Sequence, residues 1–367
     1  MPLTRDDILA ALRTVQDPDL KKDLVTLQMV KEVAVSGTDI AVGIELTTPA
    51  CPMKDRIRRE VEEAIQLKGL QHGEAVGRID ITFTADVRSP QDRARGKDNP
   101  LPMVKHVIGV GAGKGGVGKS TIAVNLAVGL ARMGAAAGLL DADIYGPSAP
   151  TMLGLEKHRP KMREGNMMMP FEVHGIEAMT IGKLVEPDKA LIWRGPMAHG
   201  AFRQLATQTA WSELDYLIVD LPPGTGDVPL TLCQLLPVTG AVVVCTPQKV
   251  AQDDARRAVR MFEELGVLVL GIVENMSYFI GDDGKEYDIF GRGGAESLAR
   301  EVNVPFLGTV PINMDLRRNC DEGAPLRNWS GSPQLGRDLD QVCRAVAQQV
   351  SIASAAGSLV QPTLSVR

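Results

Sequence analysis

The clearest chemistry in the sequence lies between residues 111 and 121, which read GAGKGGVGKST. Residues 113–120 satisfy the pattern G-x-x-x-x-G-K-S/T of loops that bind nucleotide phosphates. In such a loop, glycines let backbone N–H groups converge on phosphate oxygens, the lysine neutralises the β- and γ-phosphates, and the hydroxyl binds Mg²⁺. A second lysine at the start of the loop suggests further charge compensation. The candidate nucleotide-binding residues are Gly113, Lys114, Gly115, Gly116, Val117, Gly118, Lys119, Ser120 and Thr121.

The elements on either side of this loop support the prediction. Residues 105–110 read as a strand that leads into the loop. Residues 120–133 read as a helix, because Ile122, Leu126 and Leu130 recur at helical spacing and a glycine follows as a stop. Strand, glycine loop and helix is the order that this motif requires. A glycine-rich turn that matched the pattern by chance would not predict these neighbours.

Three aspartates follow two further apolar strands. Asp141 and Asp143 end the segment LLDAD, and Asp220 ends the segment LIVD. The ends of parallel strands face the ligand, and an aspartate there holds Mg²⁺, directly or through water, in P-loop enzymes. We therefore expect Asp141 and Asp220 to support Mg²⁺ together with Ser120. For Asp141, a role as a cap or in an ion pair stays open.

The composition bounds the class of protein. The chain has 367 residues, of which 44% are hydrophobic, and its formal net charge is -5. A net negative charge does not attract nucleic acid or an anionic membrane surface. The N-terminus has no apolar signal segment, and no apolar run approaches the length of a membrane span. Five scattered cysteines suit a reducing compartment. We expect a cytoplasmic protein without nucleic-acid or membrane partners.

The predicted elements divide the chain into two domains. Residues 1–88 are expected to form a small α+β domain with two helices and three strands, at 4–15, 53–67, 30–35, 40–46 and 78–83. Residues 89–103 are polar and contain prolines, as a linker does.

The second predicted domain, residues 104–352, alternates apolar strands with helices. This alternation predicts an α/β domain with a mostly parallel sheet covered by helices on both faces. Its strands are expected at 107–110, 138–141, 216–220, 241–246 and 269–273. Residues 353–367 are expected to be a disordered tail.

Together these motifs resemble the deviant-Walker ATPases, and most closely the Mrp/ApbC iron–sulfur cluster carriers. The resemblance rests on the phosphate loop with Lys114 and on the segments DADIYGPS and DLPPGTGD, at 141–148 and 220–227. Shorter blocks agree: WRGPM at 193–197, TPQ at 246–248, ENMSY at 274–278 and FGRGG at 290–294. Residues 1–88 resemble the small Fe–S assembly domain that often precedes these ATPases, through DPD at 17–19 and TTPACP at 47–52. The resemblance covers the chain to about residue 350.

The resemblance implies a P-loop NTPase fold and a Mg²⁺-dependent ATPase that assembles iron–sulfur clusters or transfers them to apoproteins. Proteins of this kind dimerise face to face around two ATP molecules, so Lys114 would reach the phosphates held by the partner subunit. Asp143 would orient the attacking water, which makes Lys114, Lys119 and Asp143 the candidate catalytic residues. Asn275 would contact adenine, and Pro311 would lie in a loop that flanks the base. The implied partners are a second copy of the chain, assembly scaffolds and apoprotein recipients.

The sequence departs from the family at the usual cluster-binding pair. Many members place C-x-x-C just after the ENMSY block, where two subunits hold one 4Fe–4S cluster through four thiolates. Here residues 281–284 read GDDG, a turn signature without a thiol. Cys51, which precedes a helix and matches a family cysteine, and Cys320, in a polar sequence setting, are the remaining candidate ligands. A structural role for Cys51 stays open. Core positions are expected for the other three: Cys233, Cys245 and Cys343.

Two other classes of protein use the same nucleotide-dependent dimer. A ParA/MinD-like positioning ATPase usually needs a basic DNA-binding face or a C-terminal amphipathic membrane helix. Residues 353–367 contain one arginine and no lysine. A reductase like the nitrogenase iron protein needs paired thiols for a surface cluster, and that pair is missing. The cluster carrier is therefore the favoured hypothesis.

Overall fold

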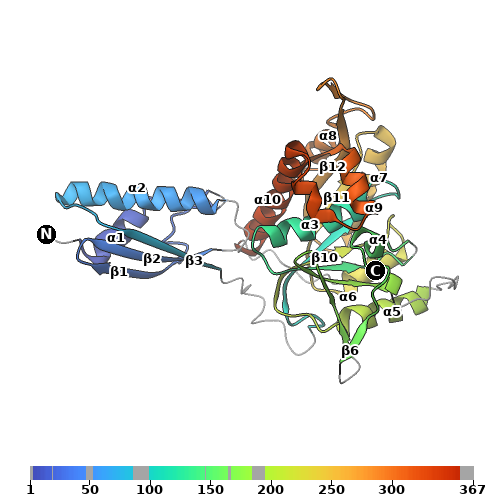
Figure 1. The fold of residues 1–367 in the computed structure, drawn as a ribbon, viewed down its shortest axis with the longest axis horizontal. Coiled ribbons are helices and arrows are strands. Elements are labelled where there is room, and N and C mark those ends of the chain that lie inside the picture. The colour runs from blue at the N-terminus through green and yellow to red at the C-terminus, as the bar shows by residue number, and fades with distance from the viewer. Residues whose placement is uncertain are drawn as a thin grey trace.

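The computed structural model describes residues 3–18, 20–46, 53–85, 99–144, 146–163, 167–183 and 195–355. Within these residues the chain forms two units, each built on a sheet of its own (Figure 1). The smaller unit has a three-stranded sheet, and the larger one has a nine-stranded sheet. Each sheet is packed against its own hydrophobic core.

The N-terminal unit packs two helices against its sheet. The first helix begins with a capping box, in which Thr4 and Asp7 accept hydrogen bonds from each other's backbone N–H groups. The middle strand pairs antiparallel with the first strand and parallel with the third. Its alternate residues are buried, so one face of the sheet meets the helices. The expected helices and strands are confirmed as α1 (Arg5–Leu12), β1 (Val30–Ser36), β2 (Asp39–Leu46), α2 (Lys54–His72) and β3 (Ile79–Ala85).

The large sheet is mostly parallel, as expected for an α/β domain. Its strand order is β13-β12-β11-β4-β10-β5-β9-β8, with β14 paired to β12. The pairs of β8 with β9 and of β12 with β13 are antiparallel, whereas the central pairs are parallel. The strands are β4 (Val104–Gly111), β5 (Ala137–Asp141), β8 (Phe171–Val173), β9 (Ile176–Thr180), β10 (Leu214–Asp220), β11 (Val238–Cys245), β12 (Val269–Ile280), β13 (Glu286–Tyr287) and β14 (Phe306–Ile312).

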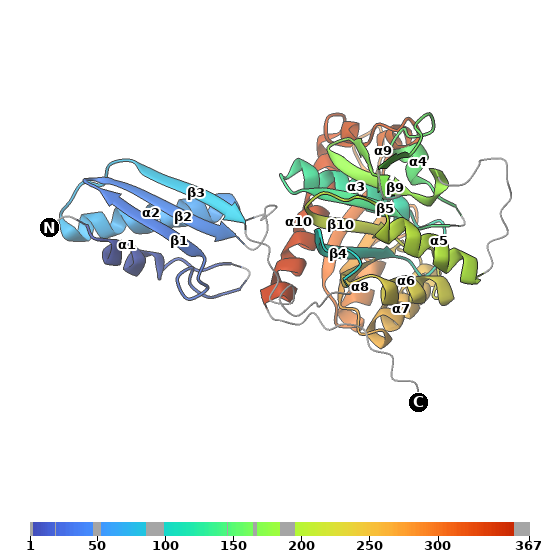
Figure 2. The same ribbon diagram turned by 90° about the horizontal axis from the view of Figure 1, so that it is seen from below.

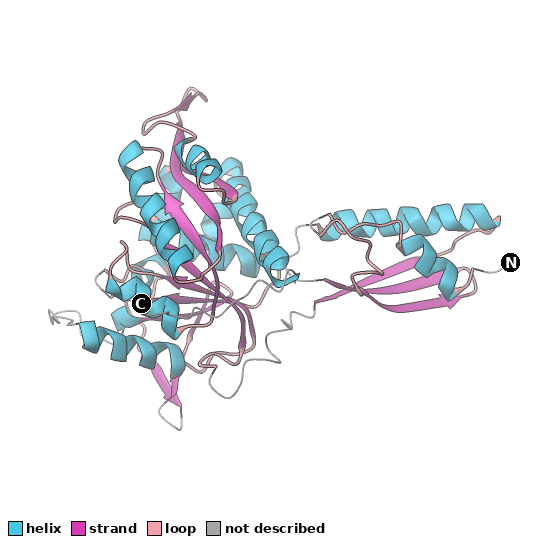
Figure 3. Cartoon of the chain, turned by 180° about the vertical axis from the view of Figure 1, so that it is seen from behind, coloured by secondary structure: helices cyan, strands magenta, loops and turns pink. Residues whose placement is uncertain are grey.

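Helices cover both faces of this sheet (Figures 2 and 3). Residues Leu217 and Val219 of β10 belong to one core cluster, while their neighbours Tyr216 and Ile218 belong to the other. Each central strand is therefore buried on both sides, which explains its continuous apolar sequence. One face carries α5 (Gly195–Thr207), α6 (Asp227–Leu235), α7 (Lys249–Glu264) and α8 (Gly294–Glu301). The other face carries α3 (Lys119–Arg132), α4 (Ala149–Met152), α9 (Met314–Asp321) and α10 (Pro333–Ala355).

The structure differs from the sequence-based expectation mainly at the sheet edges. The expected strand 269–273 continues to Ile280, and the edge strands β8, β9, β13 and β14 were not expected. A small two-stranded antiparallel sheet and two short 3-10 helices complete this unit. The strands are β6 (Lys161–Arg163) and β7 (Met167–Met169), and the 3-10 helices are η2 (Ile181–Lys183) and η3 (Pro325–Trp329). Helix α10 includes residues 353–355, which were expected in the tail. Among the described helices, none has the length and apolar character that a membrane span requires.

Candidate nucleotide site

The phosphate loop lies at the C-terminal edge of the large sheet. It connects β4, a central strand, to α3, which begins at Lys119. In the strand register Asp220 of β10 is level with Val110 of β4 and with Asp141 of β5. The topology therefore brings the loop and both strand-end carboxylates to one edge, as the sequence predicts.

Glycine is required at different positions of the loop for different physical reasons. Gly116 and Gly118 both have a φ of 82°, a left-handed conformation that favours glycine. A Cβ on Gly113 would lie 2.0 Å from the backbone oxygen of Asp254 on α7, so this glycine allows the loop to pack closely. A Cβ on Gly115 would meet nothing within 4 Å. The loop is thus fixed on one side and open on the other.

A buried cation lies between two carboxylates at the end of the loop. Lys119 is only 6% exposed, and its Nζ lies 2.6 Å from Asp220 Oδ1 and 3.4 Å from Asp143 Oδ2. The same ammonium group donates to Ser120 Oγ at 3.3 Å. Burial raises the pKa of the Asp220 carboxyl, while the charge of Lys119 opposes that shift. The arrangement holds a buried positive charge at the C-terminal end of the glycine loop.

Asp143 has one oxygen that no described residue satisfies. Its Oδ2 faces Lys119, whereas Oδ1 is buried and accepts no hydrogen bond within the part of the chain that the structure describes. Buried carboxylate oxygens normally have partners, so an unpaired one points to a ligand or a water molecule. Oδ1 is available to accept a hydrogen bond from a water molecule.

Asp141 is engaged by the protein itself. Its Oδ1 accepts from the backbone N–H of Asp143 at 3.2 Å, and its Oδ2 accepts from the N–H of Ala149 at 3.1 Å and the hydroxyl of Thr180 at 3.0 Å. The carboxyl is fully buried, and burial, followed by the charge of Asp220, raises its pKa to about 7. These contacts correspond to the capping role left open above, and the partner Thr180 was not identified from the sequence.

The oxygen donors at this edge fit a hard divalent cation. The Ser120 hydroxyl and the Asp220 carboxylate are the kinds of ligand that Mg²⁺ takes beside phosphate oxygens. Among the described residues no group of three or more His, Cys, Asp or Glu side chains is arranged to hold a metal ion.

Lys114 lies at the opposite end of the loop from Lys119. Its side chain is partly buried, and it forms no hydrogen bond or ion pair with another described residue. A long cation without a partner near a phosphate-binding loop is available to a ligand.

Asn275 and Pro311 lie on neighbouring strands beside the loop. Asn275 Nδ2 donates to the backbone oxygen of Val117 at 2.9 Å, so Asn275 holds the loop to β12. Asn275 pairs with Val310 of β14, and the next residue, Pro311, lies within that strand. The expectation that Pro311 belongs to a loop is wrong, because the pairing of β14 with β12 continues through Ile312.

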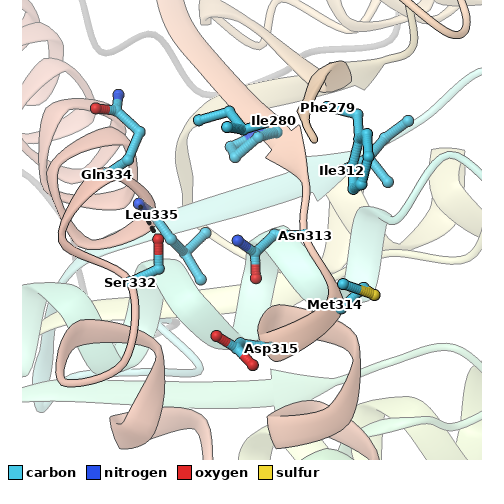
Figure 4. A pocket seen from close by; sticks show the side chains of 10 residues that line it. Phe279, Ile280, Ile312, Asn313, Met314, Asp315, Ser332, Gln334 and Leu335 are labelled. Carbon is cyan, nitrogen blue, oxygen red and sulfur yellow. Dashed lines mark hydrogen bonds between the residues drawn. The ribbon is translucent and has the colours of Figure 1, made fainter. Parts of the chain in front are cut away.

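A cavity of about 230 Å³ opens just beyond these residues (Figure 4). Figure 4 shows Asn313 in the middle of the cavity wall, with Phe279, Ile280 and Ile312 from the strand ends and Met314 and Asp315 from the start of α9. Pro311, Ser332, Gln334 and Leu335 complete the lining. No residue of the phosphate loop lines this cavity. It is mostly apolar and follows the strand pair that holds Asn275.

Four of the five cysteines lie within the described residues, and all four are buried. The polar setting expected for Cys320 is wrong: the residue is 4% exposed on the inner face of α9, and burial raises the pKa of its thiol. The core positions of the others are confirmed, and burial raises the thiol pKa of Cys233 and Cys245 to about 12. Burial also raises the pKa of Cys343. Cys51 lies outside the described residues.

The segment GDDG forms the turn that its composition predicts. It joins β12 to β13, and the N–H of Gly284 donates to the backbone oxygen of Gly281 at 2.9 Å. Gly284 has a φ of 74°, which favours glycine. The hairpin has no thiol at its tip.

Glu274 is an acidic residue inside β12 for which the sequence predicts no functional role. It is fully buried and accepts from the N–H groups of Gly293 at 2.9 Å and Ala295 at 2.7 Å, at the start of α8. It also accepts from the hydroxyl of Ser277 at 2.5 Å. A carboxylate at a helix N-terminus is favourable. The sequence feature that could have identified Glu274 is its position directly after the apolar run at the start of β12.

These features define a class of protein. A glycine loop between a central parallel strand and a helix, with acidic residues at the ends of the next two strands along the sheet, is the arrangement of P-loop NTPases. Residues 103–349 match the family model described as NUBPL iron-transfer P-loop NTPase, and residues 5–76 match that of an iron–sulfur cluster assembly protein. The chain belongs to the NUBPL iron-transfer P-loop NTPase family.

Similar proteins agree with this assignment. The chain is 46% identical to the iron–sulfur cluster carrier protein of Synechocystis sp., over 96% of this chain and 99% of the relative. It is 48% identical to the protein of the same name from Deinococcus radiodurans, over 95% and 96%. Among solved structures, a nucleotide-binding protein from Archaeoglobus fulgidus in complex with ADP is 39% identical, with a TM-score of 0.56, over 65% of this chain and 93% of that one.

Proposed function

We propose that this chain is an ATP-hydrolysing carrier that binds an iron–sulfur cluster, transfers it to apoproteins and works as a homodimer. The observation that carries the ATPase part is the buried Lys119 held between Asp220 and Asp143 at the end of the phosphate loop. The cargo is inferred from relatives that match nearly the whole chain and are named iron–sulfur cluster carriers. The match of residues 5–76 to an iron–sulfur assembly family supports a carrier rather than a positioning ATPase.

In this proposal the phosphate loop binds the phosphates of ATP. The side of Gly115 and Gly116 on which a Cβ would meet no atom leaves room for phosphate oxygens against the backbone. The N-terminus of α3 directs its unpaired N–H groups at the same point. The ammonium group of Lys119 already lies at the loop. When ATP binds, it would exchange its contact with Asp220 for contacts with phosphate oxygens.

Ser120 and Asp220 are the proposed ligands of Mg²⁺. When bound, the ion would neutralise negative charge on the β- and γ-phosphates. Asp141 takes a different part in the proposal, because three donors already occupy its carboxylate. It accepts from the backbone N–H groups of Asp143 and Ala149, and so fixes the position of Asp143.

Asp143 and Lys114 are the proposed catalytic residues that complete the site with Lys119. The unpaired Oδ1 of Asp143 would accept a hydrogen bond from the attacking water and hold it toward the γ-phosphate. Lys114 would stabilise the charge that develops on the phosphates, as an arginine finger does. Because Lys114 has no partner among the described residues, we propose that it acts on the nucleotide of the partner subunit.

The base would lie on the far side of the loop from these groups. Asn275 holds Val117 of the loop, and Pro311 and the cavity follow directly along the paired strands. A mostly apolar cavity with a few amide groups suits a planar heteroaromatic ring.

The cluster is proposed as cargo, with Cys51 as a ligand. The hairpin at residues 281–284 offers no thiol, and Cys320 is in the core, so neither is part of the proposal. A thiol near a helix N-terminus is easily deprotonated, and a thiolate is the form that binds iron.

Anaerobic reconstitution with iron and sulfide, followed by phosphate-release and cluster-transfer assays, tests both parts. We expect Lys119→Ala to lose phosphate release. The control is Lys105→Ala, at the start of β4, which removes a lysine paired with Asp215 and should keep phosphate release. We expect Cys51→Ala to lose the cluster and the buried Cys320→Ala to retain it. Wild-type protein that releases no phosphate, or that neither holds nor transfers a cluster, would contradict the corresponding part.

A further inference from the structure

Three asparagine side chains form a buried chain of hydrogen bonds behind the proposed nucleotide site. Asn125 is on α3, Asn328 on η3 and Asn319 on α9, and all three are buried. Asn328 Nδ2 donates to Asn125 Oδ1 at 2.7 Å, and Asn319 Nδ2 donates to Asn328 Oδ1 at 3.0 Å. Asn125 Nδ2 in turn donates to the backbone oxygen of Thr121 at 2.8 Å.

The two ends of this amide chain reach the two halves of the proposed site. Thr121 lies in the first turn of α3, directly after the phosphate loop. Asn319 lies on α9, and the residue that caps α9 is Asn313, which accepts from the N–H of Leu316 at 2.9 Å. Asn313 and the first residues of α9 line the cavity proposed for the base. The amide chain therefore connects the phosphate side to the base side through the protein interior.

Hydrogen bonds impose a geometry that apolar packing alone would not. Apolar side chains would hold α3, η3 and α9 together through contacts that are non-directional. Amide hydrogen bonds have a defined length and direction, and a buried amide that loses its partner is costly. The chain from Asn125 to Asn319 therefore fixes how the first turn of α3 lies relative to α9.

We propose that Asn125 and Asn328 are positioning residues that align the phosphate-binding turn with the base-side cavity. This inference rests on the proposed function, since it requires a nucleotide that occupies both places. A ligand that spans both halves gains affinity from their correct spacing, as any two-point ligand does. Pyrophosphate, which can occupy only the phosphate half, does not gain from it.

The test compares two ligands rather than activity. Calorimetry would measure the affinities of full-length wild type and Asn328→Ala for Mg-ADP and for Mg-pyrophosphate. We expect Asn328→Ala to weaken ADP binding about tenfold and to leave pyrophosphate binding within about twofold, because only ADP depends on the spacing of the two halves of the site. A loss of stability alone would lower both affinities together, so the ratio of the two separates positioning from folding.

A matched control comes from the same short helix. Trp329 Nε1 donates to Asp340 on α10 at 2.7 Å, a contact that does not join the two halves of the site. Trp329→Phe removes this hydrogen bond and should keep the wild-type ratio of the two affinities. If Asn328→Ala does not fold, Asn328→Asp places an oxygen against Asn125 Oδ1 without changing shape, and the same change in ratio is expected.

The outcomes separate this inference from the proposed function. An unchanged ratio in the folded Asn328 variants, beside a wild type that binds ADP, would overturn the positioning role alone. A change in ratio in Trp329→Phe equal to that in Asn328→Ala would also overturn it. A wild type that binds neither ligand would overturn the proposed function, and this inference with it.

Discussion

Lys119 Nζ lies 2.6 Å from Asp220 Oδ1, and both side chains are almost fully buried. Asp143 adds a second carboxylate at 3.4 Å, so one interior cation faces two anions. Breaking a buried ion pair by removing one partner is costly because the remaining charge stays in a poorly solvated place. Because we propose that the same cation contacts the phosphates of a nucleotide, stability and nucleotide binding would depend on one group.

This relationship predicts strong coupling between Lys119 and Asp220. Lys119→Met leaves two carboxylates without a cation, and we expect it to lower the free energy of unfolding by about 3–5 kcal/mol. Asp220→Asn should cost less, because Lys119 keeps Asp143. In the double variant the loss should be smaller than the sum of the two single losses, since fewer charges remain unpaired. Urea unfolding of the four proteins without nucleotide measures this coupling, and additive losses would contradict it.

The raised pKa of Asp141 predicts a pH-dependent stability. Its pKa is about 7 in the folded chain, against an ordinary value of 3.8, so between these values the folded state holds a proton that the unfolded state has released. The contribution of Asp141 to stability is therefore fully present below pH 3.8, falls as the pH rises, and is lost above pH 7. The slope is at most about 1.4 kcal/mol per pH unit for one group.

Asp141→Asn tests this dependence, because an amide does not titrate. We expect the variant to lose more stability relative to wild type at pH 5 than at pH 8. Chemical unfolding of both proteins at the two pH values gives the difference, in which shared contributions from other groups cancel. A difference between variant and wild type that is the same at both pH values would show that Asp141 does not titrate in this range.

Residues with a local signature were predictable from the sequence. The loop, the strand before it and the helix after it follow from glycines, an apolar run and helical spacing, and the structure confirms these elements. That Asp141 and Asp220 end neighbouring strands also follows from a parallel sheet. Their different surroundings do not, because one of the three donors to Asp141 is the hydroxyl of Thr180, on a strand far along the chain.

The setting of Cys320 was not predictable for the same reason. Its neighbours in sequence are charged, but α9 directs the thiol into the core against Asn125 of α3, and only the packing of the two helices decides that. The strand β14 contains Gly308 and Pro311, which weaken a strand signal, and its pairing with β12 compensates. Non-local contacts thus explain most of the differences from the expectation.

Two glycines of the loop should respond differently to the same substitution. Gly113→Ala places a methyl group 2.0 Å from the backbone oxygen of Asp254, so α7 or the loop must move. We expect a loss of about 1–3 kcal/mol in the free energy of unfolding. Gly115→Ala meets nothing within 4 Å and should leave stability unchanged, but its methyl group would occupy the space proposed for phosphate oxygens. Thermal unfolding and ADP titration of both variants separate the effects, and equal stability of the two would contradict the packing argument.

The proposed role of Lys114 predicts complementation between two inactive variants. If Lys114 acts on the nucleotide of the partner subunit, Lys114→Ala and Asp143→Ala should each lose phosphate release as homodimers. In a mixed dimer, the Lys114→Ala subunit keeps its own Asp143 and receives Lys114 from the other subunit, so one complete site forms.

An equal mixture that exchanges subunits freely should therefore recover about a quarter of the wild-type rate, since half of the dimers are mixed and each has one complete site. If Lys114 instead acts on the nucleotide of its own subunit, every site in the mixture lacks one of the two residues and no rate returns. Mixing Lys114→Ala with Lys114→Ala,Asp143→Ala provides the control, because that pair supplies no Lys114 and should stay inactive under either arrangement. Phosphate release measured before and after subunit exchange distinguishes the two, and a mixture that stays inactive although mixed dimers form would show that the partner subunit does not supply this lysine.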